Sequence, residues 1–289
     1  MDKGAIMSGF NSLSRRNAVK LCFSCAAATS ALSGALSASQ KTEGVTNVLF
    51  LVGDYWHNPI TQEKNWQDVL RHTGWRLRFA RATRFVTPEA LADTDLFVVA
   101  RYAKTNNLGW SPDEIVESRD DEEAFLTDER ESAIIENVRR GMGLLAMHCA
   151  VWNGERKSFM DLLGIAEPHM HTKVQPTQLH NLDPEHPITR GVASAKLGED
   201  EIFSADLVPG RSKILFNLKG EEQSIDTAGG WCHDFGAGRV VVLLPGHTPH
   251  PFHAKSFKEI MWRSAHWALK RDIAPVSFEN GRPPEKSIY

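Results

Sequence analysis

The chain has 289 residues, an apolar fraction of 42% and a formal net charge of −3 at neutral pH. A chain of this length can bury one sizeable core, and this composition is typical of a soluble globular protein. The sequence contains no basic stripe, which argues against nucleic acid as a partner. It also lacks an internal repeat or a low-complexity linker, so a single elaborated domain is the simplest organisation.

The first 39 residues are typical of a twin-arginine signal peptide. Arg15 and Arg16 precede the uncharged, moderately apolar stretch 21–36, and small residues follow at 37–39. The apolar stretch is too short and too weakly apolar to span a bilayer stably. We therefore expect recognition by the twin-arginine (Tat) export machinery, a periplasmic or secreted location, and a mature domain over 40–289 with its core at about 45–273. A disordered tail is the alternative.

Cysteine usage is compatible with removal of such a signal. The chain has four cysteines, and Cys22 and Cys25 fall within the expected signal. Cys149 and Cys232 are far apart in sequence, and two such cysteines do not make a disulfide framework. We expect two unpaired core residues, with one buried bridge as the alternative.

Strands alternate with helical patterns along most of the mature chain, which predicts parallel βαβ units. The expected strands are 45–52, 75–80, 95–101, 142–147 and 239–244. The expected helices are 61–73, a short one opening at 87, 127–140, 155–163 and 256–270. Between them lie short, less regular pieces at 174–179, 200–204 and 213–218, and a hairpin over 231–244. The sequence predicts an α/β fold with a doubly wound, mostly parallel sheet and an inserted antiparallel or irregular region.

Several short runs resemble one known family. They are Gly-Met-Gly-Leu-Leu-Ala-Met-His-Cys at 141–149, Asp-Pro-Glu-His-Pro-Ile-Thr-Arg-Gly-Val at 183–192, Asp-Glu-Ile-Phe at 200–203, and His-Asp-Phe-Gly-Ala-Gly-Arg-Val at 233–240 with Pro-Gly-His at 245–247. In this order they resemble the trehalose-utilisation, or ThuA-like, family over nearly all of the mature chain. The resemblance implies a flavodoxin-like core similar to class I glutamine amidotransferases, and an association with trehalose and oxidised-sugar metabolism.

The turn after the fourth expected strand allows three interpretations. His148 stands at its tip, and Cys149 follows it. The imidazole could act as a ligand or in acid–base chemistry, or it could be a packed core residue. Cys149 could instead be a nucleophile activated by His247 or His233. The resemblance counts against a nucleophile, because ThuA-like proteins commonly have a small residue at this position.

A group of histidines follows the last expected strand. His247 comes directly after the Pro-Gly that ends the strand, and His250 and His253 are spaced three apart behind it. Imidazoles together with a carboxylate suit zinc, manganese, iron or cobalt. The predicted ligands of a divalent metal are His247, His148, Glu201, His250 and His253, and His169 or His171 could join them. A surface histidine-rich turn is the alternative.

Further polar and aromatic residues follow other strand ends and are expected at the same edge of the sheet. The predicted catalytic residues are His148, Glu201 and His57. The predicted substrate-binding residues are Asp54, Trp56, Arg101, Tyr102, Trp152 and Trp231. Aromatic faces stack on sugar rings, although core packing is the alternative for at least two of these aromatic residues. A surface ion pair is the alternative for Arg101, and a solvated edge carboxylate is the alternative for Glu201.

These observations favour an exported protein that acts on a carbohydrate. A keto-sugar or keto-glycoside is chemically attractive because its carbonyl acidifies the neighbouring carbon-bound proton. A metal with a His or Glu base could then promote enolisation, elimination, isomerisation or hydrolysis. The alternatives are a noncatalytic sugar-binding or accessory protein and a Cys-dependent hydrolase or amidotransferase. The sequence leaves the oligomeric state open, a homo-oligomer included.

Overall fold

The computed structural model describes residues 44–54, 56–102, 124–152, 155–222, 224–274 and residue 278. The chain divides into two units at residues 38 and 39, and all described residues belong to the second unit. The expected signal peptide lies outside the described residues and stays a prediction.

Within the described residues, five parallel strands form one half of the large sheet. Their order is β2-β1-β3-β4-β11, and every neighbouring pair is parallel. They span Arg76–Ala80, Asn47–Val52, Leu96–Ala100, Gly143–Met147 and Gly238–Leu243, respectively. β1, β3 and β4 are buried from end to end, which explains their continuous apolar sequences. The strand order is that of flavodoxin-like folds, so the predicted α/β core is confirmed.

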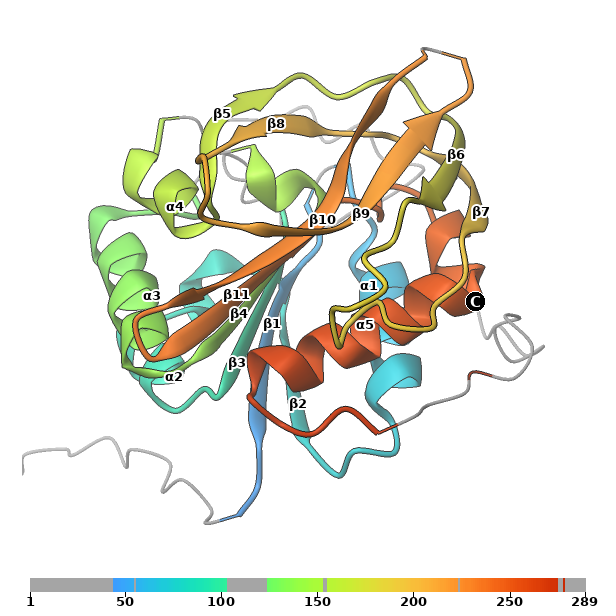
Figure 1. Cartoon of the computed structure of the whole chain (residues 1–289). Coiled ribbons are helices and arrows are strands. Elements are labelled where there is room, and N and C mark those ends of the chain that lie inside the picture. The colour runs from blue at the N-terminus through green and yellow to red at the C-terminus, as the bar shows by residue number, and fades with distance from the viewer. Residues whose placement is uncertain are drawn as a thin grey trace, which may run out of the picture. The chain divides into compact units, whose positions relative to one another are not determined.

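Helices cover both faces of this half. In Figure 1, α1 and α5 lie on one side of the sheet, and α2 and α3 lie on the other. α5 contacts β4 and β11 as well as α1, and α3 contacts β11 and α4. The helices α1 to α5 span Pro59–Leu70, Pro88–Ala92, Asp128–Arg140, Lys157–Leu162 and Lys255–Ala268.

Side-chain caps place the helix starts. The Thr127 hydroxyl accepts the Arg130 N–H at 3.2 Å, and Thr87 caps α2 in the same way through Ala90. Asn58 Oδ1 accepts the Ile60 N–H at 2.8 Å, so α1 begins two residues earlier than the apolar spacing predicts. His57 directly precedes this cap, so the start of α1 fixes its position.

The other half of the sheet is antiparallel, as expected for the insertion. β10 (Asp226–Phe235), β9 (Lys213–Gly220), β6 (Gln175–His180) and β7 (Ala195–Asp200) follow β11 in that order. A separate pair is formed by β5 (Ile165–His169) and β8 (Ser204–Leu207).

The short, irregular piece expected over 200–204 is mostly a link between two strands. β7 ends at Asp200 and β8 begins at Ser204, so residues 201–203 link the two sheets. The reason is that Ile202 exchanges backbone and hydroxyl hydrogen bonds with Thr172 rather than with a neighbouring strand. This link carries Glu201.

Two further expectations concern membrane spans and cysteines. In the part of the chain that the structure describes, no helix has the length and apolar character needed to cross a bilayer. Cys149 and Cys232 are both buried and unpaired, as expected for small core residues.

Candidate metal centre

Polar side chains follow four parallel strands at the point where each strand ends. Asp54 and His57 follow β1, Tyr102 follows β3, His148 follows β4 and His247 follows β11. The carboxyl ends of parallel strands meet at one edge of a sheet. In this strand order β2 is added on one side of β1, and β3, β4 and β11 are added on the other, so the order of the strands changes direction between β1 and β3. The topology therefore brings residues that are distant in sequence to one crevice.

Asp54 orients His57. Its Oδ1 accepts the His57 Nδ1 proton at 2.7 Å and the His57 backbone N–H at 3.0 Å, and its Oδ2 accepts the Tyr102 N–H at 2.6 Å. Burial alone would raise the pKa of Asp54, but His57 and these N–H donors lower it below its ordinary value. Because an ionised carboxylate only accepts hydrogen bonds, His57 Nδ1 carries the proton and Nε2 presents a lone pair.

His148 stands at a strained turn. Its φ is 46°, in the left-handed region that favours glycine, and its side chain is fully buried. Nδ1 donates to the Leu244 carbonyl at 2.9 Å, so Nε2 again carries the lone pair. That buried Nε2 has no hydrogen-bond partner among the described residues, and the Glu201 Oε2 lies 3.7 Å from it. A buried ring nitrogen with a free lone pair is a position where a ligand or metal ion can bind.

The loop that carries His247 is held by Asp200. The two oxygens of this buried carboxylate accept the Gly246 and Thr248 N–H groups, each at 2.9 Å, on either side of His247. Burial raises the pKa of Asp200 to about 6. Asp200 is not among the site residues predicted from the sequence, although it precedes Glu201 directly in an acidic pair.

The three imidazoles and Glu201 converge. Ligand atoms of His57, His148 and His247 all lie within 4.8 Å of one another. His247 Nδ1 is 3.2 Å from His57 Nε2 and 3.2 Å from Glu201 Oε2. In a tetrahedral site with metal–ligand bonds of about 2.0–2.1 Å, neighbouring ligand atoms lie about 3.3 Å apart. The residues thus fit a divalent metal in spacing, in tautomer and in the unpartnered Nε2 of His148.

The electrostatics agree with a ligand set. Burial, together with the nearby His148, lowers the pKa of His247 to about 4, so its imidazole is neutral at neutral pH, as metal binding requires. Burial alone would raise the pKa of Glu201, but the surrounding histidines lower it, so this residue remains a carboxylate.

A cavity of about 360 Å³ opens beside these residues. Three of the residues predicted to bind substrate line it, namely Trp56, Tyr102 and Trp152. The insertion supplies much of the rest of its wall, namely Met170, His171, Glu201 and Phe203. His171 Nδ1 lies 3.4 Å from Glu201 Oε1, whereas His169 pairs with Asp206 elsewhere. Sequence reasoning did not find Met170, because only the insertion's path over the strand ends brings it there.

Three predicted substrate-binding residues do not line the cavity. Asp54 is the buried carboxylate that orients His57, and the other two, Trp231 and Arg101, lie in the core. Trp231 on β10 is fully buried, and its Nε1 donates to the Leu163 carbonyl at 2.8 Å. Arg101 is also buried, and its Nη1 donates to the carbonyls of Gly53 and Arg81. The Trp231 side chain points into the core from within β10, and the Arg101 side chain does so from the end of β3. A linear sequence pattern cannot distinguish this direction from one into the crevice.

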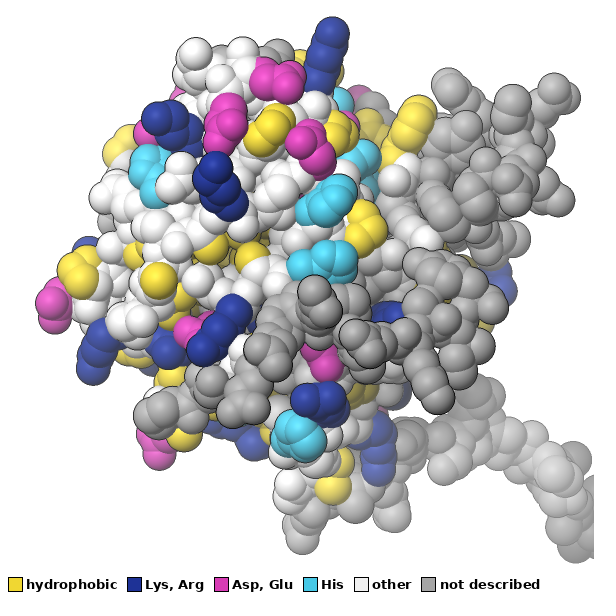
Figure 2. Space-filling model, turned by 90° about the vertical axis from the view of Figure 1, so that its right-hand side faces the viewer, with side chains coloured by type: hydrophobic (Ala, Val, Ile, Leu, Met, Phe, Trp, Pro, Cys, Tyr) yellow, Lys and Arg dark blue, Asp and Glu magenta, His cyan; other side chains and the backbone are white. Residues whose placement is uncertain are grey.

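Two predicted metal ligands also lie outside the cluster. His250 and His253 belong to a short 3-10 helix, η3 (His250–His253), and both are exposed. His250 Nδ1 lies 3.2 Å from the Thr248 hydroxyl. Figure 2 shows histidine and acidic side chains gathered on one face of the molecule. The three-residue spacing therefore reflects a surface turn, and only His247 of this group reaches the cluster.

Cys149 is placed poorly for a nucleophile. Its thiol is buried, 3.5 Å from His57 Nδ1 and 3.8 Å from Asp54 Oδ2. Burial raises the pKa of the thiol well above its ordinary value, and the Asp54 charge raises it further. The strained position at the tip of the turn belongs to His148, one residue earlier.

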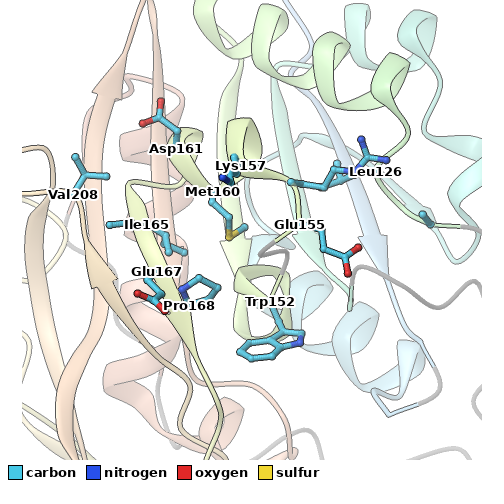
Figure 3. Close-up of a pocket in the computed structure, with 13 residues that line it drawn as sticks. Leu126, Trp152, Glu155, Lys157, Met160, Asp161, Ile165, Glu167, Pro168 and Val208 are labelled. Carbon is cyan, nitrogen blue, oxygen red and sulfur yellow. The ribbon is translucent and has the colours of Figure 1, made fainter.

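A second hollow of about 780 Å³ shares Trp152 with the first. Figure 3 shows Ile165 and Pro168 on one side of this hollow and Glu155 and Trp152 on the other. No cluster of potential metal ligands has been found there within the described residues. The histidine cavity is therefore the better candidate for chemistry, although it is smaller.

The fold and the cluster together define a flavodoxin-like α/β protein with a histidine-rich crevice at its strand ends. The family model of ThuA, described as trehalose utilisation, matches residues 47–268. The chain belongs to this family, which confirms the resemblance seen in the sequence.

Solved structures show the same fold. A putative ThuA-like protein from Bacteroides uniformis is 14% identical, with a TM-score of 0.60 over 79% of this chain and 92% of that chain. One from Parabacteroides merdae is 15% identical, with a TM-score of 0.59 over 80% and 93%. The catalytic mutant of Gan42B, a GH42 β-galactosidase from G. stearothermophilus, is 9% identical, with a TM-score of 0.51 over 78% of this chain and 30% of that chain. No curated protein matches the sequence.

Proposed function

We propose that this protein binds a divalent metal through His57, His148 and His247 and acts on a keto-sugar or keto-glycoside, with Glu201 as a further ligand or as the base. The observation that carries the proposal is the convergence of three imidazoles from three separate strand ends, with the lone pair of His148 buried and unpartnered. Membership of the trehalose-utilisation family supports a carbohydrate as the substrate.

The chain's own residues are oriented for this task. Asp54 and the Leu244 carbonyl hold the Nδ1 protons of His57 and His148, which aims both Nε2 lone pairs at the crevice. A bound divalent ion would polarise the carbonyl oxygen of a keto-sugar and acidify the neighbouring carbon-bound proton. Glu201 lines the same cavity as a carboxylate and can accept that proton.

The cavity suits a sugar in size and lining. Its volume of about 360 Å³ falls within the range of about 300–1,000 Å³ that is usual for small-molecule sites. The aromatic side chains of Trp56, Tyr102 and Trp152 offer flat apolar faces to the ring of a carbohydrate. These faces would contact the sugar ring, while the histidine side of the cavity would contact its carbonyl group.

Metal analysis combined with turnover tests the proposal. We expect purified protein to contain about one equivalent of a transition metal, and His247→Ala to lose most of it while remaining folded. Glu201→Gln should lower turnover of 3-keto-glucosides by about 10²–10⁴-fold, as expected for loss of a general base. Full metal retention in His247→Ala would contradict the metal site. A metal-containing protein that binds keto-glycosides without turnover would favour an accessory sugar-binding protein.

We also propose that the protein is exported through the twin-arginine route, supported by Arg15, Arg16 and the apolar stretch behind them. Replacing both arginines by lysine should leave the precursor in the cytoplasm, because the export machinery recognises the arginine pair. Cell fractionation measures the effect. Undiminished export of the double variant would disprove the twin-arginine assignment.

A further inference from the structure

A third hollow, distinct from the two described above, lies at the opposite end of β11 from His247. It has a volume of about 580 Å³, and Arg239, the second residue of β11, lines it. Four other cationic side chains complete what we call the basic hollow, together with one carboxylate, Asp272. They are Arg190, Arg263, Lys270 and Arg271. The proposed metal centre contributes no residue to it.

The positive charge of the basic hollow is only partly compensated. The chain as a whole carries a formal charge of −3, so five cations against one carboxylate is a local excess. Arg239 pairs with Asp234 at 3.1 Å, and Arg263 lies 3.8 Å from Glu259. Among the described residues, no carboxylate pairs with the other three cations; Arg190 donates to the Glu185 carbonyl and Arg271 to the Thr46 hydroxyl. Such an excess attracts an anion.

Two of the guanidinium groups are held in place before any ligand arrives. Arg239 lies over the Trp267 ring at 4.4 Å and donates to the Trp267 carbonyl at 3.0 Å. Arg263 donates through Nη1 to the Arg190 carbonyl at 2.6 Å, and its buried Nε has no hydrogen-bond partner among the described residues. Fixed donors bind a ligand with less loss of side-chain entropy.

Lys270 has a backbone conformation that its side chain does not favour, which suggests that the side chain has a functional role. It follows α5 with φ at 56°, and its N–H donates to the Trp267 carbonyl at 3.0 Å. This is the left-handed position after a helix where glycine is favoured and a side chain is strained. A strained residue that is also an unpaired cation lining a hollow points to a ligand.

We propose that the basic hollow binds the phosphoryl group of a small organic phosphate. A tetrahedral oxyanion matches guanidinium forks, which donate paired hydrogen bonds to two of its oxygens. Pro187 and Ile273 give the hollow an apolar side that can receive the carbon part of the ligand. The site is independent of the proposed function.

Calorimetric titration of the full chain with inorganic phosphate and glucose 6-phosphate tests this site, with glucose as the uncharged control. We expect both anions to bind with a dissociation constant of about 1 mM or tighter. Lys270→Asn keeps a residue that tolerates the left-handed backbone but removes the charge. It should weaken binding about tenfold and leave Tm within about 4 °C of the wild type. Arg263→Gln should weaken binding at least as much, and Lys270→Arg should restore it.

Two controls separate this site from other sources of affinity. Lys196→Gln removes one exposed charge on β7, outside the basic hollow, and should leave phosphate binding unchanged. His247→Ala should also leave phosphate binding unchanged, because His247 does not line the basic hollow. Loss of binding in this variant would show that a metal at the histidine cluster holds the phosphate. The proposal is overturned if the wild type binds neither anion, if Lys196→Gln weakens binding as much as Lys270→Asn, or if His247→Ala abolishes it.

Discussion

The parallel and the antiparallel halves of the sheet contribute different things to the crevice. The parallel half supplies the three histidines, each within a few residues of a buried strand end. The antiparallel insertion supplies Glu201 and the wall around it, from the segments that directly follow β7 and β5. Ligands anchored on rigid strands are positioned more closely than those on loops. We infer that the parallel half fixes the metal site, whereas the insertion shapes what can enter it.

His148→Gly should give the largest effect, because it removes a ligand from the parallel half. Glycine adopts a φ of 46° without strain, so the turn can keep its shape while the imidazole is lost. We expect metal content to fall to a small fraction of the wild type and turnover to fall with it. Elemental analysis and circular dichroism of the purified variant measure both points. A folded His148→Gly protein with full metal content would show that the parallel half does not define the site.

The origin of the histidines explains how much of the site could be predicted. His57, His148 and His247 follow apolar runs that read clearly as strands, and parallel strands must end at one edge. Similar reasoning predicted Trp231 and Arg101 at the crevice, but the direction of a side chain within or directly after a strand depends on neighbouring elements. The structure turns both residues into the core.

The contribution of the insertion was harder to predict. Its polar, irregular segments indicate antiparallel pairing but not which strand lies beside which, and the short piece expected at 200–204 is mostly a link between β7 and β8. Asp200 holds the His247 loop through two hydrogen bonds, to residues 46 and 48 positions further along the sequence. No local pattern predicts contacts of that range.

Asp200→Asn tests whether the insertion only shapes the crevice or also holds a ligand in place. The amide can accept from one of the two N–H groups but presents its own N–H₂ to the other. We expect unfolding free energy to fall by about 1–3 kcal/mol and metal affinity to fall about tenfold, as for other residues that orient a ligand. Competition with a metal-binding dye and thermal denaturation measure the two effects.

Asp206→Asn is the matched control for this change. Asp206 lies on β8 of the same insertion and pairs with the exposed His169, away from His247. It should leave metal affinity unchanged. If the two variants behave alike, the Asp200 hydrogen bonds do not position His247. In that case the insertion shapes the crevice but does not hold a metal ligand in place.

Cys149→Ser should give the smallest effect, although Cys149 follows His148 directly in the parallel half. The thiol is buried and its pKa is raised by burial and by Asp54, so it is protonated and serves as a small core residue. A serine hydroxyl at this position can donate to Asp54 and fills nearly the same volume. We therefore expect metal content to be unchanged and turnover on keto-glycosides to stay within about threefold of the wild type, less than the tenfold change that about 1.4 kcal/mol would give. A loss of turnover with the metal retained, together with protection of the thiol from alkylation by substrate, would instead identify Cys149 as the reactive group and return the protein to the hydrolase or amidotransferase class.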